Sequence, residues 1–421
     1  MGVKLAINGG QPVVDSDKAK FEWPIIDHEA EKAVIDQLHT SISIYNRSGV
    51  LQEFEDEFSN FHNRRFGLLS NSGTSAIFSM YEGINLQPGD EVLCPVYTFH
   101  ATVSPMMYMG AIPIFCDCDE EGNMLYDDLK SKVTEKTKAV IVTHMWGVPA
   151  SDIKKIRDYC RNNRLVLFED CSHAHGASID GEKVGTFGDA ASWSLQGPKI
   201  ISGGEGGIML TDNKDIYSRA MMQGHYNKRP FQEIDNDNPL YAYSQTGLGL
   251  KLRSHPLAVA LALQQFKHLK EFIQQKQEYA EMFNKALGRY DFITTPKIDS
   301  NIQNSWYAYN FKYNPQAAFG VSRDEFVEAL LAEGLVEVDI PGSTGLINDL
   351  PLFNNPEKII GRMYKSPLSR QTGFVNAEKF HQSIIKLPVW ATRSSIKTVE
   401  SYIEGIVKVS DYLSTHKRIK N

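Results

Sequence analysis

Short apolar segments alternate with amphipathic segments between about residues 65 and 211. Several apolar segments are rich in Val, Ile, Leu and Phe without polar alternation, which is typical of strands covered on both faces. Residues 75–84 and 151–163 have helical spacing, and a helix is also predicted over residues 98–110. This alternation predicts a largely parallel sheet with helices on both sides. The predicted strands are residues 65–70, 91–96, 112–118, 139–145, 165–170, 191–196 and 207–211.

The rest of the chain predicts a second, smaller domain. Residues 256–287 form one long helical pattern, apolar at its start and charged at its end, which indicates a connector that leaves the first domain. The basic residues 416–420 are expected to be a frayed, solvated end. We therefore expect a large α/β domain over residues 1–265, and a connector helix with a small α+β domain over residues 266–421. The other predicted segments are helices at residues 28–38, 51–61 and 322–333, strands at 307–313 and 383–388, an irregular loop at 341–370 and a terminal helix.

The composition is that of a soluble globular protein and narrows the functional classes. Lys and Arg total 44 against 51 Asp and Glu, and this net charge of −7 argues against binding nucleic acid by neutralising phosphates. No segment approaches the roughly 20 apolar residues of a membrane span, and the first residues lack the apolar core of a signal peptide. We expect a cytoplasmic enzyme with reduced thiols and no metal site. The cysteines are scattered, at Cys94, Cys116, Cys118, Cys160 and Cys171.

A lysine in a glycine-rich segment is the first candidate for chemistry. Lys199 lies a few residues beyond an apolar strand and precedes four glycines that surround Glu205. Glycines allow tight backbone turns, which would hold the lysine at the rim of the sheet rather than in solvent. Burial lowers the pKa of an amine, and a neutral amine can form a Schiff base. Taken alone, this segment is better explained by a surface lysine beside a hairpin.

A carboxylate ends another apolar strand. Asp170 lies where a parallel strand reaches the crevice in which such sheets bind ligands. A carboxylate there can hold a pyridine nitrogen protonated, which keeps the ring an electron sink. His173, three residues later, would face the same ring. The alternatives are a helix N-cap for Asp170 and a structural role for His173 and His175.

Two further segments complete the pattern. A helix predicted to start near residue 75 would offer free N–H groups to a phosphate, with Gly73 allowing close approach and Thr74 adding a hydroxyl. Ser194 would supply another hydroxyl. Tyr97 and Phe99 follow a strand, where a flat ring could stack on them, although core packing explains either aromatic equally well. In this chain order, phosphate cradle, aromatic, carboxylate and lysine together predict a pyridoxal 5′-phosphate site.

These residues resemble the sugar aminotransferases of the DegT/DnrJ/EryC1/StrS family, which have the fold-type-I architecture of aspartate aminotransferase. The resemblance runs nearly end to end, and Lys199 followed by Gly-Glu-Gly-Gly is highly specific. It implies a large, mostly parallel seven-stranded sheet domain and a smaller C-terminal α+β domain. The matching positions are residues 5–12, 48–49, 54–55, 72–76, 88–92, 144, 169–170, 199, 204–207 and 386–388.

The resemblance implies a role for each site residue. Lys199 would form the Schiff base with the cofactor and carry the proton, and Asp170 would pair with the pyridine nitrogen. Phe99 would stack on the ring, and His173 would lie near its 3′-oxygen. Family members are typically homodimers in which a loop of the partner completes each active site. The phosphate would be bound by Gly73, Thr74 and Ser194.

The chain departs from the family pattern in two places. Gln196 and Gly197 precede the lysine, which is closer to members acting on cyclitols or free sugars than to members acting on nucleotide sugars. In the family, a Gly-x-Asn-x-Arg segment brings a phosphate-binding Asn from the partner. Here residues 249–253 place Lys251 at that position, and its ammonium would meet the phosphate as a point charge.

The implied activity is transamination. Glutamate or glutamine would give its amino group to the cofactor, and pyridoxamine phosphate would then aminate a carbonyl in the biosynthesis of an amino sugar. The acceptor would be a nucleotide-linked keto sugar, a cyclitol ketone or a free acidic sugar aldehyde such as an 8-oxo derivative of 3-deoxy-octulosonate. The alternatives are a pyridoxamine-phosphate-dependent dehydratase of the same fold and a non-catalytic, cofactor-binding regulatory protein. Residues 227–243 and 339–370 are expected to shape the substrate pocket. The candidate substrate ligands are His225, Tyr226, Lys228 and Arg229.

Overall fold

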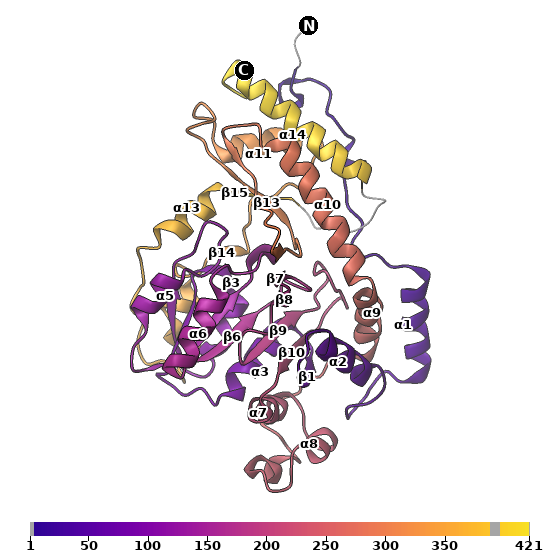
Figure 1. Ribbon diagram of the computed structural model, residues 1–421, viewed down its shortest axis with the longest axis vertical. Coiled ribbons are helices and arrows are strands. Elements are labelled where there is room, and N and C mark those ends of the chain that lie inside the picture. Colours follow the sequence, from indigo (N-terminus) through magenta and orange to yellow (C-terminus); the bar gives the residue numbers. More distant parts are fainter. Residues whose placement is uncertain (1–3, 388–395, 421) are drawn as a thin grey trace.

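A seven-stranded sheet lies at the centre of the computed structural model, which describes residues 4–387 and 396–420 (Figure 1). The strand order is β1-β10-β9-β6-β5-β2-β4. Strand β10 runs antiparallel to both of its neighbours, and the other neighbouring pairs are parallel, so the predicted sheet is confirmed. These strands are β1 (Phe66–Ser70), β2 (Glu91–Pro95), β4 (Ile112–Cys116), β5 (Thr137–Thr143), β6 (Val166–Asp170), β9 (Ala190–Ser194) and β10 (Gly207–Thr211).

Helices cover both faces of this sheet. Successive strand residues belong to different hydrophobic clusters: Leu68 packs in one cluster and Leu69 in the other. Because both faces are buried, the strands have no regular polar alternation. One cluster includes α3 (Gly73–Gly83), α4 (Ser104–Met107) and α7 (Lys214–Gly224), and the other includes α2 (Gly49–Phe61), α6 (Ile153–Asn163) and α9 (Pro256–Lys267).

The helix predicted over residues 98–110 is largely absent. The segment begins with β3 (Tyr97–Phe99), which pairs with β14 (Thr344–Leu346), and continues as η3 (His100–Thr102) and the short α4. The pairing of β3 with a strand almost 250 positions away in the sequence replaces the local helix. The remaining elements before residue 256 are η1 (Ala6–Asn8), η2 (Ser16–Lys18), α1 (His28–Thr40), α5 (Tyr126–Lys132), η4 (Met145–Gly147), β7 (Ser178–Ile179), β8 (Glu182–Lys183), α8 (Lys228–Glu233) and η5 (Pro239–Tyr243).

The long helix predicted over residues 256–287 is interrupted. It consists of α9 and α10 (Leu269–Leu287), which are separated by His268. The N–H of His268 bonds to the carbonyl of Gln265, three residues back, so the turn tightens and the axis is broken there. The division of the domains after residue 265 remains a proposal.

The C-terminal part is built on a three-stranded antiparallel sheet, in the order β11-β13-β15, with α10, α11 and α14 around it (Figure 1). The basic tail is not frayed. Ile419 is buried in this third cluster, and its carbonyl accepts a hydrogen bond of 2.7 Å from the Asn8 side chain, whereas the four basic residues of the tail are exposed, as predicted. The elements of this part are β11 (Ile293–Thr294), β12 (Ile302–Gln303), β13 (Tyr309–Tyr313), α11 (Arg323–Ala332), β14, α12 (Pro351–Asn354), η6 (Pro356–Lys358), α13 (Val375–Ser383), β15 (Ile384–Leu387) and α14 (Ile396–His416).

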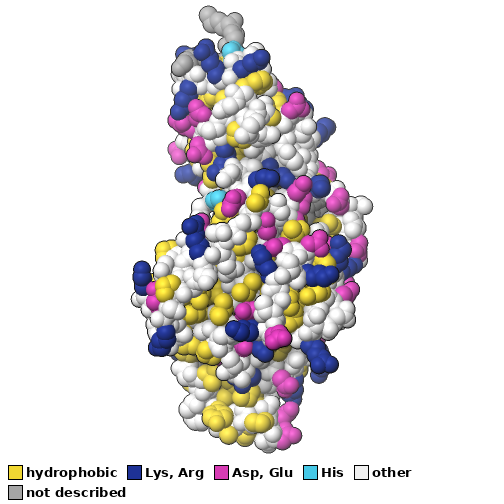
Figure 2. Space-filling view, turned by 90° about the vertical axis from the view of Figure 1, so that its left-hand side faces the viewer, with side chains coloured by type: hydrophobic (Ala, Val, Ile, Leu, Met, Phe, Trp, Pro, Cys, Tyr) yellow, Lys and Arg dark blue, Asp and Glu magenta, His cyan; other side chains and the backbone are white. Residues whose placement is uncertain are grey.

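The surface shows no concentration of one charge on the face drawn in Figure 2, where basic and acidic side chains are interspersed. None of the helices in residues 4–387 and 396–420 has the length and apolar character needed to cross a membrane.

All five cysteines are free and buried. The last residue of the predicted strand 383–388, Pro388, lies outside the described residues.

Candidate active site

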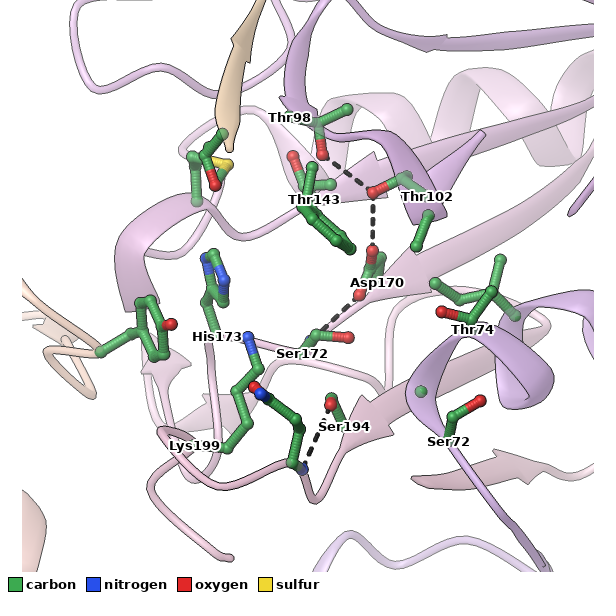
Figure 3. Close-up of a pocket in the computed structure, with 18 of the residues that line it drawn as sticks. Ser72, Thr74, Thr98, Thr102, Thr143, Asp170, Ser172, His173, Ser194 and Lys199 are labelled. Atoms are coloured by element: carbon green, nitrogen blue, oxygen red, sulfur yellow. Dashed lines mark hydrogen bonds between the residues drawn. The ribbon is translucent and has the colours of Figure 1, made fainter. Parts of the chain in front are cut away.

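A cavity of about 430 Å³ lies at the carboxyl ends of the parallel strands (Figure 3). Seven of the residues predicted from the sequence line it together, although they come from five different segments of the chain. Its position agrees with the rule that such sheets bind ligands beyond their strand ends. Apart from Lys199, no lysine or arginine among the described residues lines it. The seven predicted residues are Gly73, Thr74, Phe99, Asp170, His173, Ser194 and Lys199.

A tight turn holds Lys199 inside this cavity. The N–H of Gly197 bonds to the carbonyl of Gly204, and the N–H of Lys199 bonds to the carbonyl of Gln196, both at 2.9 Å. Gly204 has a φ of +83°, a conformation that glycine adopts without strain. Burial lowers the pKa of Lys199 to about 8; the Asp170 carboxylate opposes this shift and the Lys386 ammonium adds to it. The lysine is therefore not a surface residue, and a substantial fraction of its amine is neutral near pH 8.

Two donors hold the Asp170 carboxylate in place. The Thr102 hydroxyl donates to Oδ2 at 2.8 Å, and the N–H of Ser172 donates to Oδ1 at 3.0 Å (Figure 3). Thr98 bonds in turn to the Thr102 hydroxyl. No helix starts after Asp170, so the alternative of a helix N-cap is wrong. The carboxylate is fixed but keeps acceptor capacity toward the cavity.

An aromatic stack flanks the lysine. The His173 ring lies 3.9 Å from the Tyr307 ring with an interplanar angle of 3°, and Trp146 lies next to both rings. The Lys199 Nζ lies 4.4 Å from the centroid of Tyr307. Burial, together with the charge of Lys199, lowers the pKa of His173 well below its ordinary value, so its ring is neutral. Sequence reasoning missed Tyr307 and Thr102, because neither stands in a motif and both enter the site through tertiary contacts.

The first turn of α3 forms another wall. The Ser72 hydroxyl caps the helix by accepting from the N–H of Ser75 at 3.1 Å. A Cβ on Gly73 would lie 2.7 Å from the Ser194 Cβ, so only glycine lets the helix approach β9 this closely. The N–H groups of a first helical turn have no partner within the helix, and the positive end of the dipole favours an anion. Gly73, Thr74 and Ser194 thus border a place suited to a phosphate.

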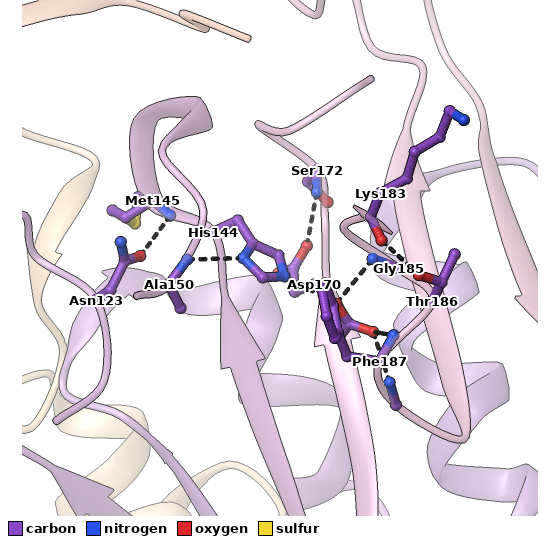
Figure 4. A network of polar contacts seen from close by, with 12 residues as sticks. Asn123, His144, Met145, Ala150, Asp170, Ser172, Lys183, Gly185, Thr186 and Phe187 are labelled. Carbon is purple, nitrogen blue, oxygen red and sulfur yellow. Dashed lines mark hydrogen bonds and ion pairs between the residues drawn. The ribbon is translucent and has the colours of Figure 1, made fainter. Parts of the chain in front are cut away.

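A buried polar network supports Asp170 from behind (Figure 4). The preceding residue, Glu169, accepts hydrogen bonds from His144 Nε2 at 3.0 Å and from the backbone N–H groups of Gly185, Phe187 and Gly188 at 2.7, 2.8 and 2.7 Å. Because His144 Nδ1 accepts from the N–H of Ala150, its Nε2 carries the proton. Burial raises the pKa of Glu169, but these donors outweigh it and the net pKa is lowered. The carboxylate is ionised and fully satisfied.

The predicted substrate ligands lie elsewhere. Arg229 is buried, its guanidinium forms two hydrogen bonds of 2.9 Å with Glu55, and it does not line this cavity, so its contact with substrate stays a prediction. His225 is also buried away from the cavity. Tyr226, Lys228 and the exposed Lys251 do not line it either, and their roles remain proposals. The 227–243 segment contributes no lining residue, whereas the 339–370 segment contributes Ser343 and Thr344.

These residues suit pyridoxal phosphate in the chemistry of each donor. The buried amine of lowered pKa suits the aldehyde, and the carboxylate held by two donors suits the pyridine nitrogen. The capped start of α3, where Gly73 leaves no room for a side chain, suits the phosphate. The neutral His173 ring fits beside an aromatic cofactor. The chain therefore provides one group of the appropriate kind for each part of the cofactor.

Comparisons with known proteins agree. Residues 24–403 match the DegT/DnrJ/EryC1/StrS aminotransferase family. The chain is 28% identical, over 99% of its length and 100% of the relative's, to a Micromonospora echinospora protein to which L-glutamine:3-amino-2,3-dideoxy-scyllo-inosose aminotransferase activity is ascribed. It is 31% identical to the GDP-perosamine synthase of Escherichia coli O157:H7 over 61% of this chain and 68% of that protein. The X-ray structure of the aminotransferase from Psychrobacter cryohalolentis superposes with a TM-score of 0.82 at 21% identity, covering 94% of this chain and 100% of that chain. The chain therefore belongs to the DegT/DnrJ/EryC1/StrS family and is a pyridoxal-phosphate-dependent aminotransferase.

Proposed function

We propose that this aminotransferase moves an amino group from glutamate or glutamine to a ketone or aldehyde of a sugar or cyclitol, in the biosynthesis of an amino sugar. One observation carries the proposal. A single cavity contains the buried amine of Lys199 and the fixed carboxylate of Asp170, with hydroxyl and amide side chains around them. The amine can accept and return a proton, while the surrounding polar groups suit a polyhydroxylated acceptor.

Each residue of the cavity has a role in this proposal. When bound, pyridoxal phosphate supplies an electron sink for the carbanion formed at the carbon that bears the nitrogen. Asp170 would hold a proton on the pyridine nitrogen, and the Lys199 amine would accept and return the proton that transamination moves. Phe99 and the neutral His173 would bound the ring. The first turn of α3 and Ser194 would hold the phosphate.

The remaining lining favours an acceptor that presents uncharged hydroxyl groups to this chain. The cavity is also lined by Gln196, Ser343 and Thr344, whose side chains can donate and accept hydrogen bonds, and by Glu205, whose carboxylate can accept them. Since Lys199 is the sole lysine or arginine that the described residues contribute, a carboxylate or phosphate of the acceptor would need cations from a second subunit. Of the three acceptor classes, the cyclitol ketone is neutral, whereas the free acidic sugar and the nucleotide-linked sugar are anionic.

Isotope transfer tests this function. The protein would be incubated with ¹⁵N-labelled glutamate or glutamine and, separately, a cyclitol ketone, an 8-oxo-3-deoxy-octulosonate and a nucleotide-linked keto sugar, with products read by mass spectrometry. Labelled amine should appear in one class, and Lys199→Ala should abolish it while the exposed Lys270→Ala retains it. Borohydride reduction and peptide mapping should place the cofactor on Lys199. Amination of none of the three classes, or a cofactor attached to another residue, contradicts the proposal.

We also propose that the functional unit is a homodimer. Phe99 lines the cavity yet is 38% exposed, so a second subunit can bury its outer side, and the exposed Lys251 is free to reach a neighbouring site. Light scattering should give twice the chain mass. Mixing Lys199→Ala with Lys251→Ala chains, after exchange of subunits, should yield more activity than the two variants separately, because one site of each hybrid has both lysines intact. A monomer, or the absence of any gain on mixing, contradicts the shared site.

A further inference from the structure

The segment that contains Tyr307 is attached to the active site by its backbone. Ser305 donates its N–H to the carbonyl of Gly147 at 2.9 Å and its hydroxyl to the carbonyl of His173 at 3.0 Å. Two residues later, the Tyr307 ring lies flat on His173 and beneath the ammonium of Lys199. One aromatic ring therefore contacts both the reactive amine and the histidine beside it.

A buried lysine outside the cavity supports this segment. Lys276, on α10, is completely buried and donates a hydrogen bond of 2.7 Å to the carbonyl of Trp306. No carboxylate of the described residues forms an ion pair with it. Fully buried lysines are rare in proteins, because removing the amine from water is costly. Here the amine is held by its hydrogen bond to the peptide group that precedes Tyr307 and lies 5.7 Å from the centroid of the Trp23 ring, and burial lowers its pKa well below the ordinary value.

The backbone at this point is strained. Trp306 has a φ of +53°, in the left-handed region that a bulky side chain rarely adopts. Such a conformation persists only where surrounding contacts enforce it. Two contacts from α10 do so: Lys276 binds the Trp306 carbonyl, and the Gln277 side chain accepts from the indole N–H at 2.8 Å. Without them the chain would relax, and the Tyr307 ring would leave its place on His173.

We propose that Tyr307 is a positioning residue of the active site, which holds the His173 ring and the Lys199 amine in register, and that Lys276 fixes Tyr307 through Trp306. The proposal rests on Lys199 being the reactive amine. It gives α10, which packs in both the second and the third hydrophobic cluster, a role in positioning the active site. Nothing in the amino-acid sequence around Lys276 indicates this role.

The groups that face the Lys199 amine allow the effect to be predicted. The Asp170 carboxylate favours the ammonium, whereas burial and the Lys386 ammonium disfavour it, and His173 is neutral. The face of the Tyr307 ring attracts a cation, so it adds to the effect of Asp170. Removing the ring should lower the pKa of the Lys199 amine by roughly half a unit to one and a half units. Removing only the phenol hydroxyl should leave it unchanged.

Competitive labelling of the full-length, cofactor-free protein measures this pKa directly. Acetic anhydride would be applied at a series of pH values, and acetylation of the peptide containing Lys199 compared with that of the exposed Lys270. Tyr307→Leu should lower the pKa of Lys199, and Tyr307→Phe, the matched control, should match the natural chain. Lys276→Met should shift it in the same direction as Tyr307→Leu, with Lys270→Met as its control.

The outcomes separate the parts of the proposal. Equal values for the Leu and Phe variants at position 307 would overturn the role of the ring. A normal value in Lys276→Met would overturn the role of Lys276; if that variant does not fold by circular dichroism, Gln277→Leu, which removes the second contact to Trp306, replaces it. Since the labelling uses neither cofactor nor sugar, its result stands even if borohydride mapping shows that the proposed function is wrong.

Discussion

Replacing Glu169 by Gln tests the network that supports the active-site carboxylate. Each carboxylate oxygen accepts two hydrogen bonds, one pair from Phe187 and Gly188 and the other from Gly185 and His144. An amide supplies only one oxygen, so its NH₂ group would face two N–H donors. Hydrogen bonds to a charged group contribute about 1.5–3 kcal/mol each, and losing two predicts that the free energy of unfolding falls by about 3–6 kcal/mol.

The pH dependence of this loss has a defined sign. The pKa of Glu169 is lowered from its ordinary value of 4.5, so the carboxylate contributes its full stabilisation above pH 4.5 and loses it as the pH falls through the folded-state pKa. A glutamine does not titrate. The difference in stability between the natural chain and Glu169→Gln should therefore be largest near neutral pH and shrink below pH 4.5.

Urea unfolding at fixed protein concentration, followed by circular dichroism from pH 7 to pH 3.5, measures both quantities. The control is Glu182→Gln, on the neighbouring hairpin, whose side chain is 42% exposed and should change the free energy of unfolding by less than about 1 kcal/mol. A loss below 1 kcal/mol in Glu169→Gln, or a difference that does not shrink in acid, would refute the account of this network.

The remaining predictions concern the cofactor. Asp170→Asn should slow the glutamate half-reaction about a thousandfold, because the electron sink loses its charged partner. Stopped-flow absorbance measures this rate, and near-normal turnover is incompatible with the role of Asp170. Gly73→Ala should weaken pyridoxal-phosphate binding about tenfold in a fluorescence titration, since the new Cβ would displace Ser194, whereas Gly342→Ala, which has open space around it, should not. Lys251→Ala should speed loss of cofactor on dialysis, and unchanged retention would remove this residue from the site.

Much of the fold was predictable because its signal is local. Burial on both faces makes each central strand an apolar segment, and helical periodicity located α6 and α3, although α3 begins at Gly73 rather than near residue 75. The proposed catalytic residues were also accessible, because Asp170 ends such a strand and Lys199 follows another one by a few residues. The break at His268 was not, since α9 packs in the cluster that also contains α2 and α6, whereas α10 continues into the third cluster, and no Gly or Pro marks the change.

Charged and aromatic side chains show where local reasoning fails. Arg229 has the chemistry of a substrate ligand, but its partner is Glu55, 174 positions away, and burial of that pair removes it from the cavity. Tyr307 stands at the start of an ordinary strand pattern, and the contacts beside it are made over long distances in the chain: Lys276 binds the Trp306 carbonyl and Ser305 binds the His173 carbonyl. The partners of such charged and aromatic side chains depend on how segments distant in the sequence pack against one another.

The strands, the helices that alternate with them and the residue types at the strand ends follow from the amino-acid order, because side-chain periodicity and turn chemistry act over a few neighbouring residues. The strand order, the aromatic stack beside the lysine and the residues that support it depend on the folded chain. Those features arise from contacts between segments far apart in the chain, where packing and burial, rather than local pattern, select the partners.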